Sequence, residues 1–333
     1  MNKNTLIGFV LIAVVLVGFS WYSQPSQEEM RAQFVKDSLE QVAKQKAGQA
    51  AKIAAYKQQQ AAKEQVAADT TALFYKALTG KAQDVVLQNA KLAVTLSTKG
   101  GTVTKAYIKN EKGSRRYVGH NIADKTGKSD DLGGVTLFSG KDQSLNYTLV
   151  AKEMNISTGD LFFEPTAVTD STVTLTAEAG QGKSLIINYR LGSDYMLHVS
   201  LRTVGMAGLF DPNTTTLGVD WHEKVKEQER GFTFENRYAR LDWKESEGGT
   251  DYISEAKTKK ETTEEEIDWI AFKNQFFSAV MISKDNFQKG GQLESTLYDK
   301  KDQENQPVRY LKDLKAQVRT SFDPTGAKPS EFE

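Results

Sequence analysis

The sequence predicts a mainly β protein, a large antiparallel sandwich preceded by one transmembrane helix and a partly helical linker. Three observations support this fold class. An uncharged run opens the chain, an Ala/Gln/Lys-rich stretch follows it, and short alternating runs then recur between glycine turns. Many short strands separated by turn residues are typical of antiparallel sandwiches. Two extended sheets packed face to face account best for a β region of this length.

The predicted anchor covers residues 1–23. The run TLIGFVLIAVVLVGFSWY, residues 5–22, carries no charge, and as a helix it just reaches across a hydrocarbon core of roughly 30 Å. Lys3 precedes the run and two glutamates follow it, so we expect the amino terminus in the cytoplasm and the rest outside. A cleaved signal peptide is the alternative, but the apolar run is long and ends in an aromatic pair, as anchors do.

Residues 24–80 form a predicted linker. Ala, Gln, Lys and Glu dominate this stretch, and these residues favour helix intrinsically. The large apolar residues are few and Gly48 interrupts them, so a helix here would be polar nearly all round. We expect a partly helical spacer. A regular coiled coil is the alternative, but the heptads are not sustained.

Residues 81–333 form the predicted β domain. Its clearest strands are VTLTAE, SLIINYR and YMLHVSLR, in which apolar residues occupy every second position. A further run, GFTFENRY, places Phe232 and Phe234 on one strand face. Glycine pairs and an Asp-Pro-Asn sequence separate the runs, which predicts turns between strands.

Composition narrows the possible functions. The 43 basic and 43 acidic residues balance, so no basic field suggests a nucleic-acid partner. The absence of cysteine excludes thiol catalysis, a cysteine-ligated metal and a disulfide scaffold. The three histidines, His120, His198 and His222, lack the spacing of a ligand pair, and no phosphate-binding or nucleophile motif occurs. We therefore expect no catalytic residue, no metal, no cofactor and no enzyme activity.

Two charged runs are interpreted as surface. Residues 222–230 mix basic and acidic side chains, which indicates a solvated strand edge or loop. The acidic run ETTEEEIDW, residues 261–269, lacks the Asp and Gly spacing of a calcium loop. We expect it to be a loop that enters the next strand.

The run WIAFKNQFFSAVMI, residues 269–282, fits two structures. Ile270, Phe272 and Phe276 follow the period of a strand, whereas Trp269, Phe272 and Phe276 also lie three and four residues apart, as on one face of a helix. A polar break, Lys-Asn-Gln, stands in the middle, just before Phe276 and Phe277. These residues alone leave both structures open.

A second stretch, KLAVTLSTKGGTVTKAYIKN, residues 91–110, contains two alternating runs around Gly100 and Gly101. Together with residues 269–282, the opening anchor and the polar spacer, it makes the chain resemble the YidC family of bacterial membrane protein insertases. The double glycine looks like the family's bend between its first two strands, and Trp269 with the Phe276-Phe277 pair is similar to a later family stretch. The long spacer resembles Bacteroidetes-type members.

The resemblance implies a fold: an antiparallel β-supersandwich similar to galactose mutarotase. Within it, residues 269–282 would be one core strand. Their polar break would mark a bend or a passage to the rim, and Phe276 with Phe277 would return to the interior.

The resemblance also implies a function. The chain would be the amino-terminal, periplasmic portion of an insertase, which assists insertion and folding of inner-membrane proteins alone or with the Sec translocon. Its partners would be inner-membrane lipid, the Sec translocon with its accessory subunits, and nascent membrane proteins. The last would be reached through a membrane core that this chain does not contain. We therefore expect a single-pass fragment in the bacterial inner membrane, with a cytoplasmic amino terminus and a periplasmic bulk, that cannot insert proteins by itself.

The alternative is a carbohydrate-binding or mutarotase-like envelope protein. By alternation, His198 shares a strand face with Ser200 and Arg202, and mutarotase-type sandwiches use a histidine and a carboxylate at a sugar ring. A lone histidine on a polar strand face is more often structural. His198 and Arg202 are therefore weak sugar-site candidates.

Overall fold

The computed structural model describes residues 73–109, 134–228, 231–304, 306 and 308–333. These belong to one compact unit, Asp69–Glu333, which is distinct from Met1–Ala68. The predicted anchor and nearly all of the predicted linker lie outside the described residues. Within the described ranges, no helix has the length and apolar character needed to cross a membrane.

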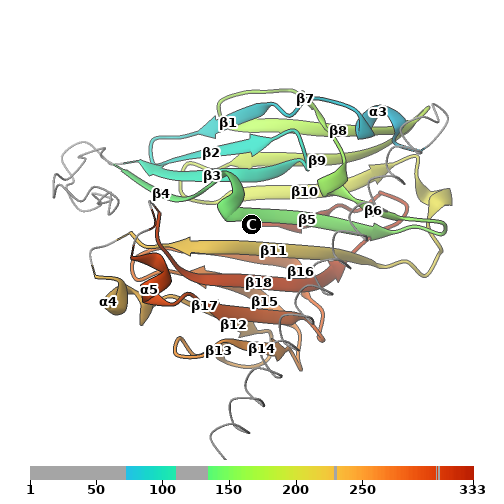
Figure 1. Ribbon diagram of the computed structural model, residues 1–333. Helices are drawn as coiled ribbons and strands as arrows, with labels where there is room; N and C mark the ends of the chain where they lie inside the picture. The colour runs from blue at the N-terminus through green and yellow to red at the C-terminus, as the bar shows by residue number, and fades with distance from the viewer. Residues whose placement is uncertain (1–72, 110–133, 229–230, 305, 307) are drawn as a thin grey trace, which may run out of the picture. The chain divides into compact units, whose positions relative to one another are not determined.

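The described residues form three antiparallel sheets (Figure 1). The four-stranded sheet has the order β1 (Asp84–Gln88), β2 (Leu92–Ser97), β3 (Thr102–Lys109), β4 (Gly134–Ser139). The nine-stranded sheet has the order β13 (Thr250–Tyr252), β12 (Arg240–Glu245), β15 (Ile267–Lys273), β16 (Ser278–Phe287), β19 (Ser330–Phe332), β10 (Leu197–Val204), β9 (Lys183–Leu191), β8 (Thr172–Gly180), β7 (Glu164–Thr166). The six-stranded sheet has the order β14 (Lys259–Thr262), β17 (Gln292–Leu297), β18 (Tyr310–Ser321), β11 (Thr216–Lys226), β5 (Gln143–Val150), β6 (Asn155–Ser157).

The described helices are short. They comprise α3 (Tyr75–Leu78), α4 (Phe232–Asn236) and α5 (Lys300–Gln303), with single 3-10 turns η2 (Gly140–Asp142), η3 (Thr158–Asp160) and η4 (Ala207–Leu209). The prediction of a mainly β, antiparallel fold is thus confirmed.

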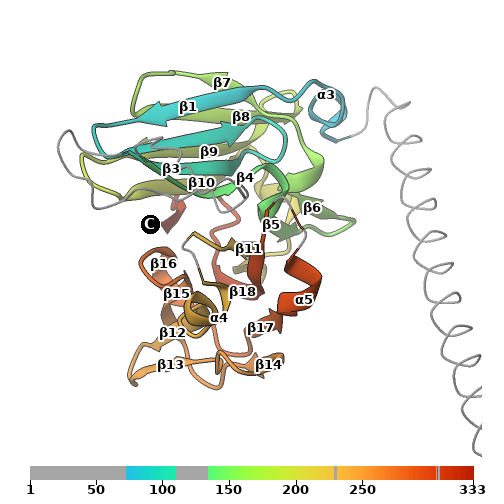
Figure 2. The same cartoon turned by 60° about the vertical axis from the view of Figure 1, so that its left-hand side comes forward.

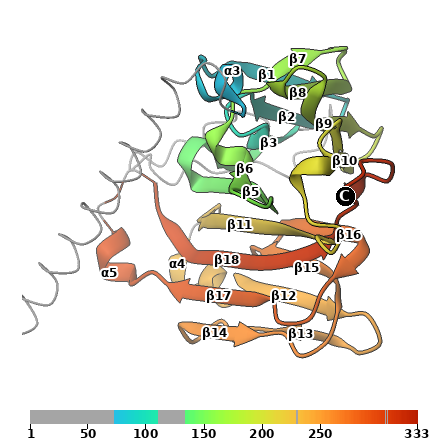
Figure 3. The same ribbon diagram turned by 90° about the vertical axis from the view of Figure 1, so that its right-hand side faces the viewer.

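The sheets pack in two places against the long nine-stranded sheet. Strands β1 to β3 run across β8, β9 and β10, and β11, β18 and β17 face β15 and β12 (Figures 1 and 3). Trp221 of β11 stacks on Phe272 of β15, with ring centroids 3.8 Å apart. Tyr189 of β9 donates its hydroxyl hydrogen to the carbonyl of Gly101, 2.6 Å away. The buried apolar residues form one continuous core cluster that draws on all three sheets.

Alternation predicted the central strands correctly. In β8 every second residue is buried, and the same holds for β9, because each strand turns one face to the core. The pairing of β9 with β8 and with β10 then places three predicted runs side by side. Their buried face is formed by Val173, Leu175, Ala177, Leu185, Ile187, Tyr189, Val199 and Leu201.

The double-glycine bend is also confirmed. Gly100 and Gly101 connect β2 to β3 with φ angles of +83° and +58°, a backbone region that side chains disfavour. A Cβ atom on Gly101 would lie 3.1 Å from both Ile187 and the Phe163 ring. The bend therefore needs glycine twice over, for its conformation and for the close approach of β9.

The prediction of one core strand over residues 269–282 is wrong. The structure has two strands there, β15 and β16, which pair antiparallel through a tight turn in which the Asn274 N–H donates to the Phe277 carbonyl. Phe276 lies at the tip of this turn, with 60% of its surface exposed, and Phe277 is only partly buried. The polar break is a hairpin turn, which satisfies its backbone groups within the sheet.

Two further interpretations are wrong. Most of residues 222–230 belong not to a surface edge but to β11, which lies between β18 and β5 and buries every second residue. The run GFTFENRY does not form a strand but contains the helix α4, so that Phe232 is buried and Phe234 is exposed. The acidic run at 261–269 ends β14 and leads through a short loop into β15, close to the expectation.

Candidate functional site

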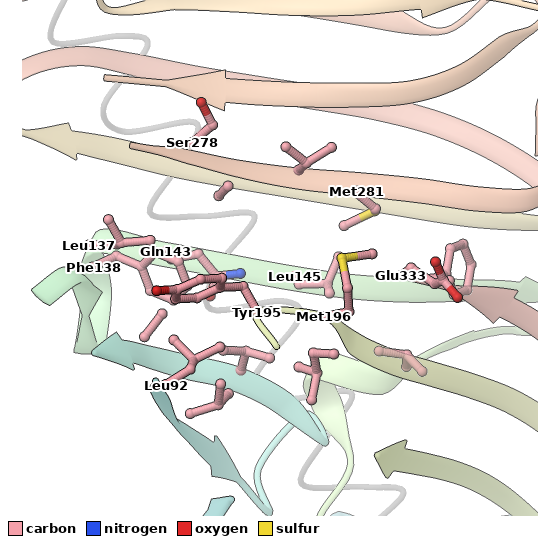
Figure 4. Close-up of a pocket in the computed structure, with 18 of the residues that line it drawn as sticks. Leu92, Leu137, Phe138, Gln143, Leu145, Tyr195, Met196, Ser278, Met281 and Glu333 are labelled. Atoms are coloured by element: carbon pink, nitrogen blue, oxygen red, sulfur yellow. The ribbon is translucent and has the colours of Figure 1, made fainter. Parts of the chain in front are cut away.

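An apolar groove of about 610 Å³ lies beside β16. Figure 4 shows Ser278 and Met281 of β16 on one side, Leu92 of the four-stranded sheet on the other, and Glu333 at one end. The further lining is almost entirely aliphatic and aromatic: Val94, Val103, Ala106, Ile108, Leu137, Phe138, Leu145, Tyr147, Tyr189, Leu197, Val199, Trp221 and Phe332 among others.

Alternation explains why this groove is apolar. The strands β2, β5 and β10 each turn their buried face toward it, and β16 closes the remaining side. Exposed apolar side chains stand at its border: Tyr195, Phe276 and Val280 have 52%, 60% and 46% of their surface exposed. Such a surface suits apolar side chains of a ligand and carries no acid–base pair of its own.

The sequence-predicted family residues meet this groove only in part. Phe276 and Phe277 both line it, from the β15–β16 turn. Trp269 lies on β15, opposite Ile282 of β16, and does not contribute to the lining. Gly100 and Gly101 lie at the β2–β3 bend, and their role is structural.

A second, polar hollow of about 560 Å³ lies on the face of the nine-stranded sheet that carries His198. The His198 Nδ1 atom lies 2.8 Å from a carboxylate oxygen of Glu333, and Asn188, Arg190 and Ser200 share the lining. Local pattern could not predict this histidine–carboxylate pair, because the two residues are far apart in the chain. Arg202, the other candidate, is exposed on β10 and does not line this hollow.

A cluster of buried charges at one end of β11 was not anticipated. Asp142 of η2 accepts hydrogen bonds from Lys226 and from the Tyr310 hydroxyl, each at 2.6 Å. Three residues before Lys226 on the same strand, Glu223 is only 5% exposed, and one of its carboxyl oxygens has no hydrogen-bond partner among the described residues. Arg309 pairs with Glu227, Nη2 to Oε1, at 2.9 Å.

The carboxyl groups of this cluster have shifted pKa values. Burial raises the pKa of Glu223 to about 8, and the nearby Asp142 carboxylate adds to the effect. Burial also raises the pKa of Glu227 to about 7, against the opposing attraction of Arg309. Burial alone would raise the pKa of Asp142 as well, but hydrogen bonds from Lys226 and Tyr310 hold it below its usual value. Glu223 is therefore mostly protonated at neutral pH.

The signal for this cluster was present in the sequence. Val219, Trp221, Glu223 and Val225 follow a strict period of two, so the glutamate occupies a position that alternation assigns to the core. Because glutamate is usually exposed, the burial of this position was not recognised from the sequence. Across the described ranges, no group of three acidic or histidine side chains is arranged to hold a metal ion.

Comparison with known proteins gives a family. The sequence profile of the YidC periplasmic domain matches residues 84–332. A membrane protein insertase YidC from Phocaeicola vulgatus is 38% identical over 335 residues, which cover 100% of this chain and 50% of that protein. Another from Bacteroides fragilis is 36% identical over 334 residues, with the same coverage. The chain thus spans about half the length of the curated relatives it matches.

Solved structures show a weaker likeness. The chain is similar to a galactose mutarotase-like protein from Lactobacillus casei, with a TM-score of 0.41 and 11% identity over 75% of this chain and 99% of that one. A galactose mutarotase related enzyme from Lactobacillus acidophilus gives a TM-score of 0.40 and 10% identity over 75% and 96%.

Proposed function

The chain belongs to the YidC periplasmic domain family, and from this premise we propose that it is the periplasmic portion of a membrane protein insertase. The observation that carries the proposal is the family match over residues 84–332, joined by relatives named membrane protein insertase YidC at 38% and 36% identity. The proposal assigns no catalytic residue to the chain.

The proposal also assigns a role to each part of the chain. Residues 1–23 anchor it once in the bacterial inner membrane with the amino terminus in the cytoplasm, residues 24–80 act as a spacer, and residues 81–333 form the periplasmic domain. The uncharged run and the charges around it support the anchor. In the longer insertase this domain contacts inner-membrane lipid and the Sec translocon, while nascent membrane proteins enter the membrane core.

The carbohydrate alternative rests on one observation, the contact between His198 and Glu333. A histidine beside a carboxylate also occurs as an ordinary surface ion pair, and Arg202 does not join it. The named relatives do not favour a sugar-binding function. Titration calorimetry against a panel of hexoses is expected to give no stereospecific heat.

The insertase proposal is tested in a strain depleted of its own insertase. The test protein is a chimera in which this chain replaces the aligned half of the Phocaeicola vulgatus relative. We expect the chimera to restore growth, as the unaltered relative does, and we expect the 333-residue chain alone to fail. Failure of the chimera at normal protein levels, while the relative succeeds, would overturn the proposal.

A further inference from the structure

Strand β19 joins the two halves of the nine-stranded sheet. On one side it pairs with β10, where Phe332 lies opposite Val199. On the other side it bonds to β16: the Ile282 N–H donates to the Glu333 carbonyl at 2.8 Å, and the Glu333 N–H donates to the Ile282 carbonyl at 3.0 Å. Past this contact, β16 continues along the apolar groove to Ser278, and β10 extends as far as Leu197.

The continuation of β16 presents backbone hydrogen-bonding groups to the groove. In an antiparallel strand, the N–H and C=O groups of successive residues point alternately to the two sides. Ile282 turns its groups toward Glu333, so Val280 and Ser278 turn theirs the same way, while the residues between them face β15. In the part of the chain that the structure describes, no backbone group pairs with Val280 or Ser278 on that side.

The opposite wall is similar. Glu333 bonds to β16, so Phe332 turns its backbone groups toward Val199 of β10, and Leu197 faces the same space two residues further along. Two strands that flank a third lie about 10 Å apart, which is twice the usual strand spacing. Between Leu197 and β16 the groove floor therefore has the width of one extended chain that bonds to both walls, and beyond Leu197 the chain would bond to β16 alone.

The curated relatives are about twice as long as this chain. We propose that, in proteins of that length, the residues directly after Glu333 continue β19 through the groove, opposite residues 281 to 278 of β16. The residues just before this position support the choice of occupant, because Ser330–Phe332 pair with β10 and Glu333 bonds to β16. The carboxyl end of the chain lies between β10 and β16 (Figure 2). Direction and register are then fixed by Glu333.

The same register dictates a side-chain pattern. Phe332 is buried, with its ring 5.4 Å from Tyr147 and 6.5 Å from Phe287, whereas Glu331 and Glu333 line the polar hollow on the other face. Side chains in phase with Phe332 enter the apolar groove, and those in phase with Glu333 meet the polar face. The continuation is therefore a strand that alternates apolar and polar residues, beginning with an apolar one.

Amide hydrogen exchange tests the proposal in the chimera with the Phocaeicola vulgatus relative. The amides of Ser278 and Val280 are expected to exchange at least ~tenfold more slowly in the chimera than in the 333-residue chain. Equal exchange in both proteins would overturn the proposal. Hydrogen exchange does not depend on growth. A failure of the strand proposal can therefore be distinguished from a failure of the insertase proposal.

A phase test on this chain gives a second, matched measurement. The chain is extended after Glu333 by six residues that alternate valine and threonine, beginning with valine in one variant and with threonine in the other. We expect slower exchange at Val280 and a higher Tm only in the valine-first variant. V280P should abolish both the rise in Tm and the slower exchange at Ser278 in the valine-first variant, because it removes an amide that faces the groove and spares the ladder to β15. Identical behaviour of both extensions would contradict the proposal.

Discussion

Glu223 is a single buried side chain that makes the stability of the domain depend on pH. It occupies an inward position of β11, between Trp221 and Val225, where a neutral carboxyl is tolerated and a charged one is not. The neighbouring Lys226 is already engaged by Asp142, so it provides Glu223 with only partial compensation.

We expect the stability of the domain to fall as the pH rises from 5 to 7.5. The Glu223 carboxyl ionises near pH 4.5 in the unfolded chain and near 8 in the folded one, so the folded state holds an extra proton throughout this range. The free energy of unfolding then decreases by up to about 1.4 kcal/mol per pH unit for this one group. Urea unfolding at several pH values measures the slope.

The matched variant is Glu223→Gln, which keeps the shape and removes the titration. Its slope between pH 5 and 7.5 should be shallower than that of the parent, with the remainder coming from Glu227, whose pKa is also raised. Asp142 does not interfere, because a lowered pKa costs stability only below about pH 4. Equal slopes in both proteins would show that Glu223 does not titrate in this range.

Gly101 gives a second prediction for a single residue. Gly101→Ala should lower the free energy of unfolding by about 1–3 kcal/mol more than Gly140→Ala. Both glycines have φ near +60°, but only at Gly101 would the new Cβ meet Ile187 and Phe163, whereas nothing lies within 4 Å of it at Gly140. Thermal melts of the two variants separate steric crowding from backbone strain, and equal losses would refute the crowding.

At the scale of elements, the β15–β16 hairpin separates a buried phenylalanine from an exposed one. Phe272→Ala should cost roughly 3–5 kcal/mol, because the side chain is 1% exposed and stacks on Trp221. Phe276→Ala, at the tip of the turn, should change stability by less than about 0.5 kcal/mol. Chemical denaturation followed by tryptophan fluorescence measures both, and a large loss in the Phe276 variant would contradict the hairpin assignment.

Sequence reasoning identified the elements with clean alternation and missed those without it. The strands β8, β9 and β10 and the double-glycine bend were all predictable, because period two and a left-handed glycine turn have direct physical causes. The helix α4 was not, since Phe232 and Phe234 are two residues apart and the helix spans only five residues. Helices this short are decided by their surroundings and not by periodicity.

The candidate sites were less predictable than the strands. The groove requires β2, β5, β10 and β16 to converge, and their pairing is a long-range property that local pattern does not contain. The same is true of the His198–Glu333 contact, which depends on the insertion of β19 beside β10. Phe276 and Phe277 were identified through family resemblance, yet the burial expected for them was wrong.

For the whole molecule, the continuous core predicts a single unfolding transition. Leu175→Ala in β8 and Leu314→Ala in β18 remove fully buried side chains from different sheets of one cluster. Each variant should shift the transition seen by far-ultraviolet circular dichroism and that seen by the described tryptophans, Trp221, Trp243 and Trp269, by the same amount. Two separated transitions would mean that the sheets unfold independently.

The position of β19 also has a bearing on the order of events during synthesis. Half of the nine-stranded sheet, from β7 to β10, is complete by residue 204, and the other half, from β12 to β16, by residue 287. Among the residues that the structure describes, the two halves are hydrogen-bonded to each other only through residues 330–333. A chain that emerges from its amino terminus onward therefore exposes two strand edges until residues 330–333 arrive. Contacts between such distant residues form slowly, and open edges invite pairing with other chains. We therefore expect a shortened chain that lacks residues 330–333 to aggregate more readily than the 333-residue chain.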